Sequence, residues 1–333
     1  MSKKWNRIYR RADSPVVNNM IDGNGNQLIL KRRKEAMTFM KHEWPLHLML
    51  LPGIVLVAIF CYFPMAGIVM AFQDFNVFQG ITGSPWVGLN NYRYLLSLPD
   101  TWSILRNTVQ IALGKMLFNL VVPIIAALLL NEIKSKVFVR GVQTIVYLPH
   151  FVSWVILAGI FVDILSPSKG IVNKMLGALG LNPIYFLGDN RYFQGTMVTT
   201  DVWKNFGYGT IIYLAALTGI DPGLYEAAKI EGANRWQQTW HVTLPGMLPI
   251  IVLMATLSLG NVLNAGFDQI YNMLSVSVYD TGDILDTFVY RIGMVEQQYS
   301  LSTAVSTFKS VVSFVLIGMS YFLADKFAGY KIF

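Results

Sequence analysis

Long apolar segments alternate with shorter polar ones along most of this sequence. Six of them come close to the roughly 20 apolar residues that an α-helix needs to cross a bilayer. They cover residues 46–72, 104–130, 138–165, 197–219, 247–275 and 303–325. The fourth and fifth segments are the least apolar, so hydropathy alone ranks them lowest. The pattern predicts an all-α membrane protein with six transmembrane helices.

Composition agrees with this prediction. Of the 333 residues, 54% are hydrophobic and 14% are charged, whereas about a quarter of the residues in soluble domains are charged. The single cysteine, Cys61, lies inside an apolar segment, which excludes an internal disulfide and indicates a packing role. The first apolar segment is too long for the core of a signal peptide, so we expect the N-terminus to be retained.

Basic residues set the predicted orientation. The net charge is +7, and lysine and arginine cluster beside the apolar segments, which favours membrane orientation over nucleic-acid binding. Residues 1–45 read as a basic arm that suits anionic lipid, and residues 46–333 as the membrane domain. Further basic residues follow in the 131–140 connection and the 220–246 loop. We therefore expect both chain ends and this loop in the cytoplasm, although basic residues in the third outside loop weaken the bias.

No catalytic or metal-binding pattern accompanies the membrane segments. The four histidines are scattered, and none stands at metal-ligand spacing from another histidine or from the cysteine. The sequence has no Walker lysine motif and no glycine-rich phosphate loop. We expect no enzyme activity and no metal or cofactor on this chain. If its work consumes ATP, another chain must hydrolyse it.

Polar residues inside two spans predict a cavity for a polar solute. Such residues are costly in lipid and usually face a cavity or another helix. In both spans they recur in steps of three or four, which puts each set on one helical face. They are Asp201, Asn205 and Tyr208 on the fourth span and Asn261, Asn264, Asp268 and Tyr271 on the fifth. Amides hydrogen-bond sugar hydroxyls and aromatic rings stack on sugar faces, but the same residues could serve only to hold helices together.

Charged residues also fall inside the predicted spans. They are Lys115, Lys204, Lys309, Asp163, Asp201 and Asp268. Either these groups pair with one another or the lysines attract an anionic solute, and the sequence leaves both readings open.

The polar stretch between the fourth and fifth spans predicts two short helices joined at a glycine. Asp221 suits a helix N-cap and Pro222 the first helical position. Gly232 is expected to end this helix. A second helix follows from Asn234, until Pro245 and Pro249 start the next span.

Charge spacing adds one expected contact in this loop. Glu231 and Arg235 stand four residues apart, the spacing of an ion pair on one helix face.

The same stretch resembles a family signature. Glu226-Ala227-Ala228 is followed by Gly232 after three residues and by Leu244-Pro245 after eleven more. This resembles the E-A-A–x3–G–x9–I–x–L-P pattern of permeases in binding-protein-dependent ABC importers, with Val242 where isoleucine is usual. An amphipathic helix resting on lipid is the alternative.

Other stretches resemble one branch of that family. Val87–Tyr92 and Arg106–Thr108 are similar to the carbohydrate-uptake branch related to the maltose permeases. Asp286–Arg291, Tyr299-Ser300 and Phe308–Ser310 resemble a polysaccharide-type subgroup called LplB-like. The likeness covers nearly everything after residue 45.

The resemblance implies a type I ABC importer permease in the bacterial plasma membrane. Two permease subunits, expected as a heterodimer, form the path, and two ATPase subunits beneath them bind ATP and Mg. An extracellular, lipid-anchored solute-binding protein delivers an oligosaccharide. The loop residues implied to contact the ATPase are Glu226, Ala227, Ala228, Glu231, Gly232, Arg235, Leu244 and Pro245.

The resemblance also touches the polar stripes. Sugar-contacting positions of maltose-type permeases match Asp201, Asn205, Tyr208, Asn261 and Asn264, with side-chain identity at Tyr208 and at the last two asparagines. A permease for a peptide or amino acid is the runner-up. A secondary carrier would show an inverted repeat, and no clear repeat is present.

Overall fold

The computed structural model describes Trp44, residues 46–260 and residues 262–328. The chain forms two compact units, Met1–Ala66 and Gly67–Phe333. The predicted basic arm up to residue 43, Asn261 and the last five residues lie outside the described residues.

The described part of the first unit is helical. It belongs to a candidate span, Leu46–Phe72, of 27 residues and mean hydropathy 2.4. Within this span the α-helix changes to a π-helix, η1 (Ala58–Tyr62), and then to a 3-10 helix, η2 (Phe63–Phe72). Pro64 lies at this change. Because proline lacks a backbone N–H and clashes with the preceding turn, such local adjustments are expected beside it.

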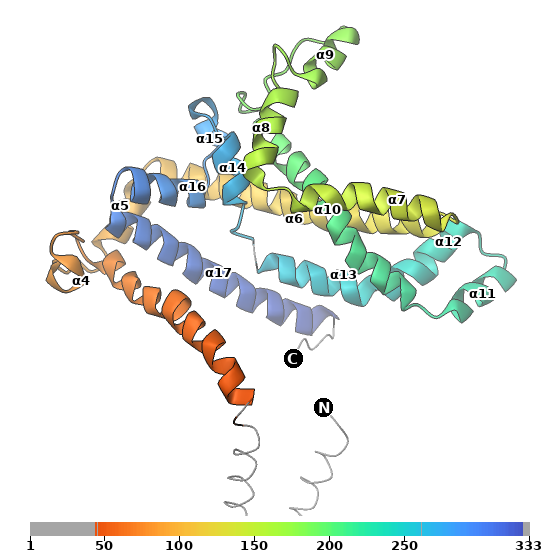
Figure 1. Ribbon diagram of the computed structural model, residues 1–333, viewed down its shortest axis with the longest axis horizontal. Helices are drawn as coiled ribbons and strands as arrows, with labels where there is room; N and C mark the ends of the chain where they lie inside the picture. The colour runs from red at the N-terminus through yellow and green to blue at the C-terminus, as the bar shows by residue number, and fades with distance from the viewer. Residues whose placement is uncertain (1–43, 45, 261, 329–333) are drawn as a thin grey trace, which may run out of the picture. The chain divides into compact units, whose positions relative to one another are not determined.

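The described part of the second unit is also helical, with one isolated antiparallel bridge between Gln73 and Trp86. Figure 1 shows the elements after η2. They are α4 (Gly80–Gly83), α5 (Asn90–Ser97), α6 (Asp100–Glu132), α7 (Lys136–Tyr147), η3 (Leu148–Phe151), α8 (Trp154–Ile164), α9 (Ile171–Ala178), α10 (Phe193–Thr218), α11 (Pro222–Ile230), α12 (Arg235–Gln238), η4 (Thr239–Thr243), α13 (Leu244–Leu259), α14 (Phe267–Met273), η5 (Val276–Val278), α15 (Tyr279–Gly282), α16 (Leu285–Tyr290), η6 (Arg291–Val295) and α17 (Tyr299–Ala328).

Four helices among the described residues are long and apolar enough to cross a membrane. Besides Leu46–Phe72 these are α6, the continuous helix Arg235–Leu259, and Tyr299–Met319 within α17. A fifth candidate is the pair Lys136–Phe151 and Trp154–Ile164, which meet at a bend of 105°. The 26-residue helix α10 is not in this set. It corresponds to the fourth predicted span, one of the two that the sequence ranks as least apolar.

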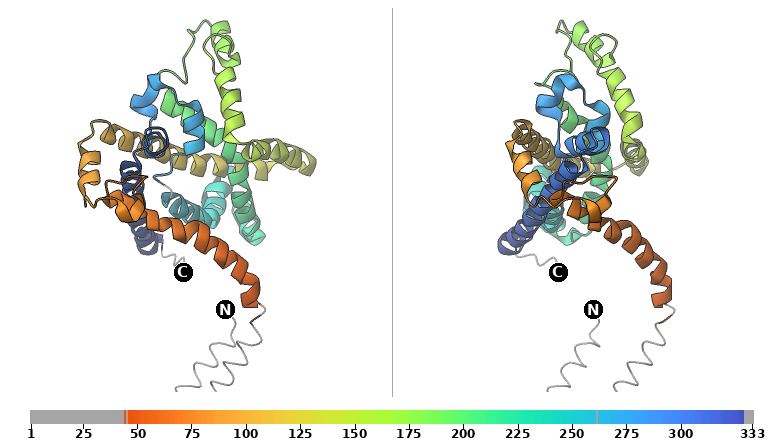
Figure 2. Two further views of the ribbon diagram at one scale, coloured as in Figure 1. Left: turned by 60° about the vertical axis from the view of Figure 1, so that its left-hand side comes forward. Right: turned by 90° about the vertical axis from the view of Figure 1, so that its left-hand side faces the viewer.

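The helix α6 is the centre of packing in the second unit. Its most extensive contact is with α10 (Figure 2). Three apolar clusters surround α6. One joins it to α8, α10 and α14, and a second joins it to α10 and α13. The third joins it to α5, α16 and α17. The span windows of the second unit are at most 22% buried. Most of their apolar surface is therefore left for lipid or other subunits.

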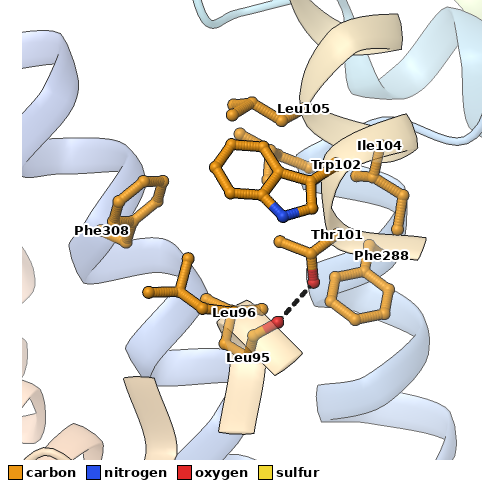
Figure 3. Close-up of a pocket in the computed structure, with 9 residues that line it drawn as sticks. Leu95, Leu96, Thr101, Trp102, Ile104, Leu105, Phe288 and Phe308 are labelled. Carbon is orange, nitrogen blue, oxygen red and sulfur yellow. Dashed lines mark hydrogen bonds between the residues drawn. The ribbon is translucent and has the colours of Figure 1, made fainter. Parts of the chain in front are cut away.

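A small apolar hollow lies where α5 and α6 meet α16 and α17 (Figure 3). Trp102, Phe288 and Phe308 line it. The Thr101 hydroxyl donates to the carbonyl oxygen of Leu95 at 2.6 Å, which satisfies this polar group locally. The hollow is a packing feature and does not suit a polar solute.

The fifth predicted span is wrong in its bounds. The helix begins at Arg235 and ends at Leu259, and α14 starts only at Phe267. Pro245 lies in the first turn of α13, as predicted, and Pro249 lies inside that helix. The span nevertheless begins at Arg235, because α12, η4 and α13 follow one another as one continuous helix. Asn264 lies in this break, whereas Asp268 and Tyr271 lie on α14, so these three residues do not share one helical face as predicted.

Gly266 closes the break between α13 and α14. Its φ is +91°, in the left-handed region that favours glycine. A Cβ atom there would lie 2.8 Å from the Lys115 ammonium nitrogen. The backbone conformation favours glycine at this position, and a larger residue would also have to displace the Lys115 ammonium group.

We predict that Gly266→Ala lowers the free energy of unfolding by about 1–3 kcal/mol, because alanine is strained at this φ and displaces Lys115. Thermal unfolding of the purified protein in detergent measures the effect. Gly159→Ala on α8 is the matched control, since no atom lies within 4 Å of its added Cβ. Equal losses for the two variants would contradict the prediction.

Candidate functional site

The loop after α10 begins with the short helix α11. As predicted, Asp221 caps it by accepting a hydrogen bond from the Gly223 backbone N–H at 2.9 Å, and Pro222 occupies the first turn. The apolar side of α11 carries Tyr225, whose hydroxyl lies 3.1 Å from that of Thr243. This contact ties the loop to the base of the following long helix.

Gly232 ends α11 in the way that the sequence predicts. Its φ is +80°. Its N–H donates to the Lys229 carbonyl at 3.0 Å, and the Ala233 N–H donates to the Ala228 carbonyl at 2.9 Å. These two bonds define a Schellman motif, which satisfies the last carbonyls of the helix and fixes the turn.

The second helix, α12, starts with a capping box. The Asn234 side chain accepts from the Gln237 N–H, and the Gln237 side chain accepts from the Asn234 N–H. The expected Glu231–Arg235 pair is not the ion pair that the structure shows, because the turn at Gly232 separates the two residues into different elements. Arg235 instead pairs with Glu132 at the end of α6.

The residues of the signature form an exposed surface on α11 and the turn. Glu226, Ala227, Glu231 and Gly232 are exposed, and Ala228 is half-buried. The other two signature residues, Leu244 and Pro245, belong to the long helix that follows. The loop is thus a pair of short helices with capped ends, and most of its signature residues are exposed.

The polar stripe on α10 does not line one open cavity. Asp201 accepts a hydrogen bond from Asn119 at 2.8 Å and lies 3.6 Å from the ammonium nitrogen of Lys115. The side chains of Lys115 and Asp201 are only 8% and 13% exposed. Lys115 also donates to the Ala265 carbonyl at 2.6 Å and to Gln269. Asp201 therefore belongs to a network that holds α6, α10 and α14 together.

Asn205 and Tyr208 meet a residue that the sequence analysis passed over. The Asn205 side-chain oxygen lies 3.0 Å from Nδ1 of His150, and the His150 and Tyr208 rings stack at 4.1 Å. His150 lies in η3, at the bend between α7 and α8. Tyr208 remains 45% exposed, so part of this aromatic and polar cluster is open to its surroundings.

The same bend explains Lys204. Its ammonium donates to the carbonyls of His150 and Val152, each at 2.7 Å. The bend frees these carbonyls from helical hydrogen bonds, and Lys204 satisfies them. The sequence left open whether the intramembrane charges pair with one another or attract an anionic solute. Charge pairing accounts in part for Lys115, whereas Lys204 satisfies backbone carbonyls.

The remaining predicted residues lie at the break after α13 and on α14. The Asn264 side-chain oxygen accepts from Lys309 on α17 at 2.8 Å. Asp268 and Tyr271 are exposed on α14, where Tyr271 packs against Phe267 and Tyr290 with ring centres 5.2 and 4.8 Å away. The structure brings Asn264 to α17 and does not join it to the α10 stripe.

One stretch that carries the family resemblance, Arg106–Thr108, contacts the segment just before another, Asp286–Arg291. The Asn107 side chain donates to the Asp280 carbonyl at 2.9 Å, and the Thr108 hydroxyl accepts from the Leu285 N–H at 2.9 Å. Nearby, Arg291 forms an ion pair with Asp283 at 2.6 Å. Burial opposes the charge of Arg291, but the hydrogen bond and charge of Asp283 prevail and raise its pKa above the ordinary value. These residues anchor α15 and α16 on α6.

Comparison with known proteins decides the family. Residues 119–327 match the family described as binding-protein-dependent transport system inner membrane component. The chain is 40% identical over 297 residues to the polygalacturonan/rhamnogalacturonan transport system permease protein YteP of Bacillus subtilis, covering 89% of this chain and 92% of that protein. The chain belongs to this family. It is a multi-pass protein of the bacterial cell membrane.

Other relatives of this permease agree. Protein LplB of Bacillus subtilis is 40% identical over 291 residues, covering 87% of this chain and 92% of that protein. A crystal structure of a bacterial ABC transporter involved in the import of the acidic polysaccharide alginate matches with a TM-score of 0.81 and 37% identity, covering 88% of this chain and 99% of that one. The type I permease fold that the sequence analysis expected is confirmed.

A second solved structure shows the alginate transporter in complex with a pentasaccharide-bound periplasmic protein. It matches with a TM-score of 0.80 and 37% identity, covering 87% of this chain and 96% of that one.

We predict that Lys115→Met destabilises the permease by about 3–5 kcal/mol, because it leaves Asp201 buried without its counter-charge. The double variant Lys115→Met/Asp201→Asn should lose less, since no unpaired charge remains. Thermal unfolding of the four proteins in a double-mutant cycle measures the coupling. Additive losses would show that the two side chains do not depend on each other.

Proposed function

We propose that this chain is one of two permease subunits of an ATP-driven oligosaccharide importer. The observation that supports this most is the exposed, capped helix pair at residues 221–238, in a chain 40% identical to sugar-transport permeases. The relatives named for polygalacturonan, rhamnogalacturonan and alginate transport favour a sugar over a peptide or an amino acid. They also argue against a secondary carrier.

In this proposal the chain crosses the membrane six times. The spans are the four apolar helices, the bent pair and α10, whose polar residues are satisfied by neighbouring helices. Both chain ends and the 220–246 loop lie in the cytoplasm, with residues 1–45 as a basic arm. A second permease completes the path, and an extracellular, lipid-anchored solute-binding protein delivers the sugar.

Two ATPase subunits hold ATP and Mg and contact the exposed face of α11 and α12. Small Ala227 and Ala228 allow close approach, and Glu226 offers a carboxylate to a basic residue of the ATPase. Arg235 and Glu231 flank the turn. The Schellman turn at Gly232 keeps the two helices at a fixed angle, so a push on α11 reaches the long helix through the Tyr225–Thr243 contact.

The sugar path runs past the exposed members of the polar clusters. These are Tyr208 with Asn205, Asn264 at the break, and Asp268 and Tyr271 on α14. We assign Asn261, which lies outside the described residues, to the same path. Asp201 does not line the path, but its contact with Lys115 holds together the helices beside it. Non-helical backbone at membrane depth is tolerated where it is packed in protein or lines a cavity, and such breaks mark binding sites in many transporters.

We predict that Gly232→Val uncouples the complex. Valine at a φ of +80° is strongly strained, so the turn must change. Sugar-stimulated ATP turnover should fall about tenfold or more, the equivalent of 1.4 kcal/mol or more. Gly232→Asn should keep coupling because asparagine tolerates this region, and Gly219→Ala, at a negative φ, is the matched control.

The measurement uses the permeases reconstituted with their ATPase and the loaded binding protein. Co-purification of the ATPase reports assembly separately. If assembly and stimulated turnover both survive Gly232→Val and Glu226→Gln, the loop does not couple the ATPase to the path.

A second prediction concerns the path. Tyr208→Ala should lower oligosaccharide uptake about two- to tenfold with assembly unchanged, because an aromatic contact contributes about 0.5–1.5 kcal/mol. Tyr94→Ala, which removes a similarly exposed tyrosine from α5, is the control. Equal uptake by the two variants would remove Tyr208 from the path.

A further inference from the structure

A cleft of about 490 Å³ with both polar and apolar lining lies between α17 and the break after α13. Three elements supply its polar side chains: the break, α16 and α17. They are Asn264, Asp286, Ser306, Lys309, Ser310 and Ser313. Of these residues, only Asn264 belongs to the polar stripes.

Lys309 is the cation of this cleft. Its ammonium nitrogen lies 2.5 Å from an Asp286 carboxylate oxygen and 2.8 Å from the Asn264 side-chain oxygen. The Lys309 and Asp286 side chains remain 16% and 25% exposed. A solute in the cleft can therefore reach both groups.

The other two intramembrane lysines differ from Lys309 in what they contact. Lys115 and Lys204 are buried, and each donates to backbone carbonyls at a break or bend in a helix. Lys309 contacts two side chains, and side chains can rotate away. Its partners can therefore be exchanged without leaving a backbone carbonyl unsatisfied.

The α17 face around Lys309 suits a sugar. Ser306, Lys309, Ser310 and Ser313 follow the spacing i, i+3, i+4 and i+7, which places them on one helical face. The Ser310 hydroxyl donates to the Ser306 carbonyl at 2.9 Å and keeps its acceptor lone pairs. This spacing is present in the sixth predicted span, but serines are only mildly polar, so the stripe does not stand out in the sequence.

We propose that Lys309 binds a carboxylate of the transported sugar and that Asp286 is the internal carboxylate which the substrate displaces. The substrate class is then an acidic oligosaccharide of uronate type. This inference rests on the proposed function and deepens it.

This exchange explains why Lys309, a cation in the proposed path, forms an ion pair with Asp286 of the same chain. A carboxylate of the substrate takes the place of the Asp286 carboxylate, so the lysine is never left unpaired at membrane depth. Competition from Asp286 keeps binding weak enough for the substrate to leave. A neutral sugar has no group that displaces Asp286.

The test compares one oligosaccharide in two forms. A short oligogalacturonate and its methyl ester differ only in charge, and each is supplied through the same binding protein to the complete reconstituted importer. For each variant we measure the ratio of transport rates, acid over ester. The preference of the binding protein is the same in all variants and cancels when ratios are compared.

Lys309→Gln should lower the acid-to-ester ratio about tenfold or more, as expected for the loss of a charge-assisted hydrogen bond. Lys309→Arg should keep the ratio within about threefold. Lys174→Gln on α9, a lysine outside the cleft, is the matched control and should leave the ratio unchanged.

Asp286→Asn separates exchange from a merely structural ion pair. Without the competing carboxylate, the half-saturating concentration of the acid should fall and its maximal rate should fall with it, while the ester is unaffected. A structural pair predicts equal losses for acid and ester in both variants, which would overturn the proposal. If single variants fail to assemble, the neutral double variant Lys309→Gln/Asp286→Asn should assemble and show the reduced ratio; an unchanged ratio in it would also overturn the proposal.

Failure of the proposed function looks different. A wild-type complex that transports neither form, and whose ATP turnover responds to neither, would contradict oligosaccharide import itself. A complex that transports both, with a ratio that Lys309→Gln does not change, would contradict only the role of Lys309.

Discussion

The constraint behind this structure is that backbone polar groups in a membrane need partners inside the protein. The chain bends between α7 and α8 and breaks between α13 and α14, and each interruption frees carbonyl groups. Lys204 satisfies those at the bend, and Lys115 satisfies Ala265 at the break. These ammonium groups therefore stabilise both interruptions.

This use of charge divides the polar residues into two groups. Asp201 and Gln269 surround Lys115 and hold α6, α10 and α14 in register. Tyr208, Asn264 and the residues around Lys309 keep part of their surface open. The first group stabilises the helix bend and the helix break, and the second lies in the space beside them. In the proposed function only the second group is open to a solute, so fewer residues line the proposed path than the two polar stripes predicted.

Local signals in the sequence predicted the loop well. Asp221, Pro222 and Gly232 act through their immediate neighbours, and their roles were as expected. The three polar residues of α10 were also correctly placed on one face, but partners far along the chain decide what each residue does: Asp201 contacts Lys115, and Asn205 contacts His150. The break before α14 was missed because residues 247–275 have enough apolar character for one span, and the left-handed Gly266 does not show in hydropathy. His150 and the serines of α17 were missed because their significance depends on which helices lie beside them.

The long helix from Arg235 to Leu259 has a mechanical consequence. Its 25 residues, at a rise of about 1.5 Å each, give a rod of roughly 37 Å. One end is fastened to α11 through Tyr225 and Thr243, and the other stops where Asn264 and Lys309 meet. Tilting such a rod at the end near α11 must displace the far end, where the irregular segment can absorb the motion. Linkage works in both directions, so a sugar seated beside Lys309 would also alter the pose of α11. In the proposed complex the loop would then report occupancy of the cleft to the ATPase as well as transmit force from it.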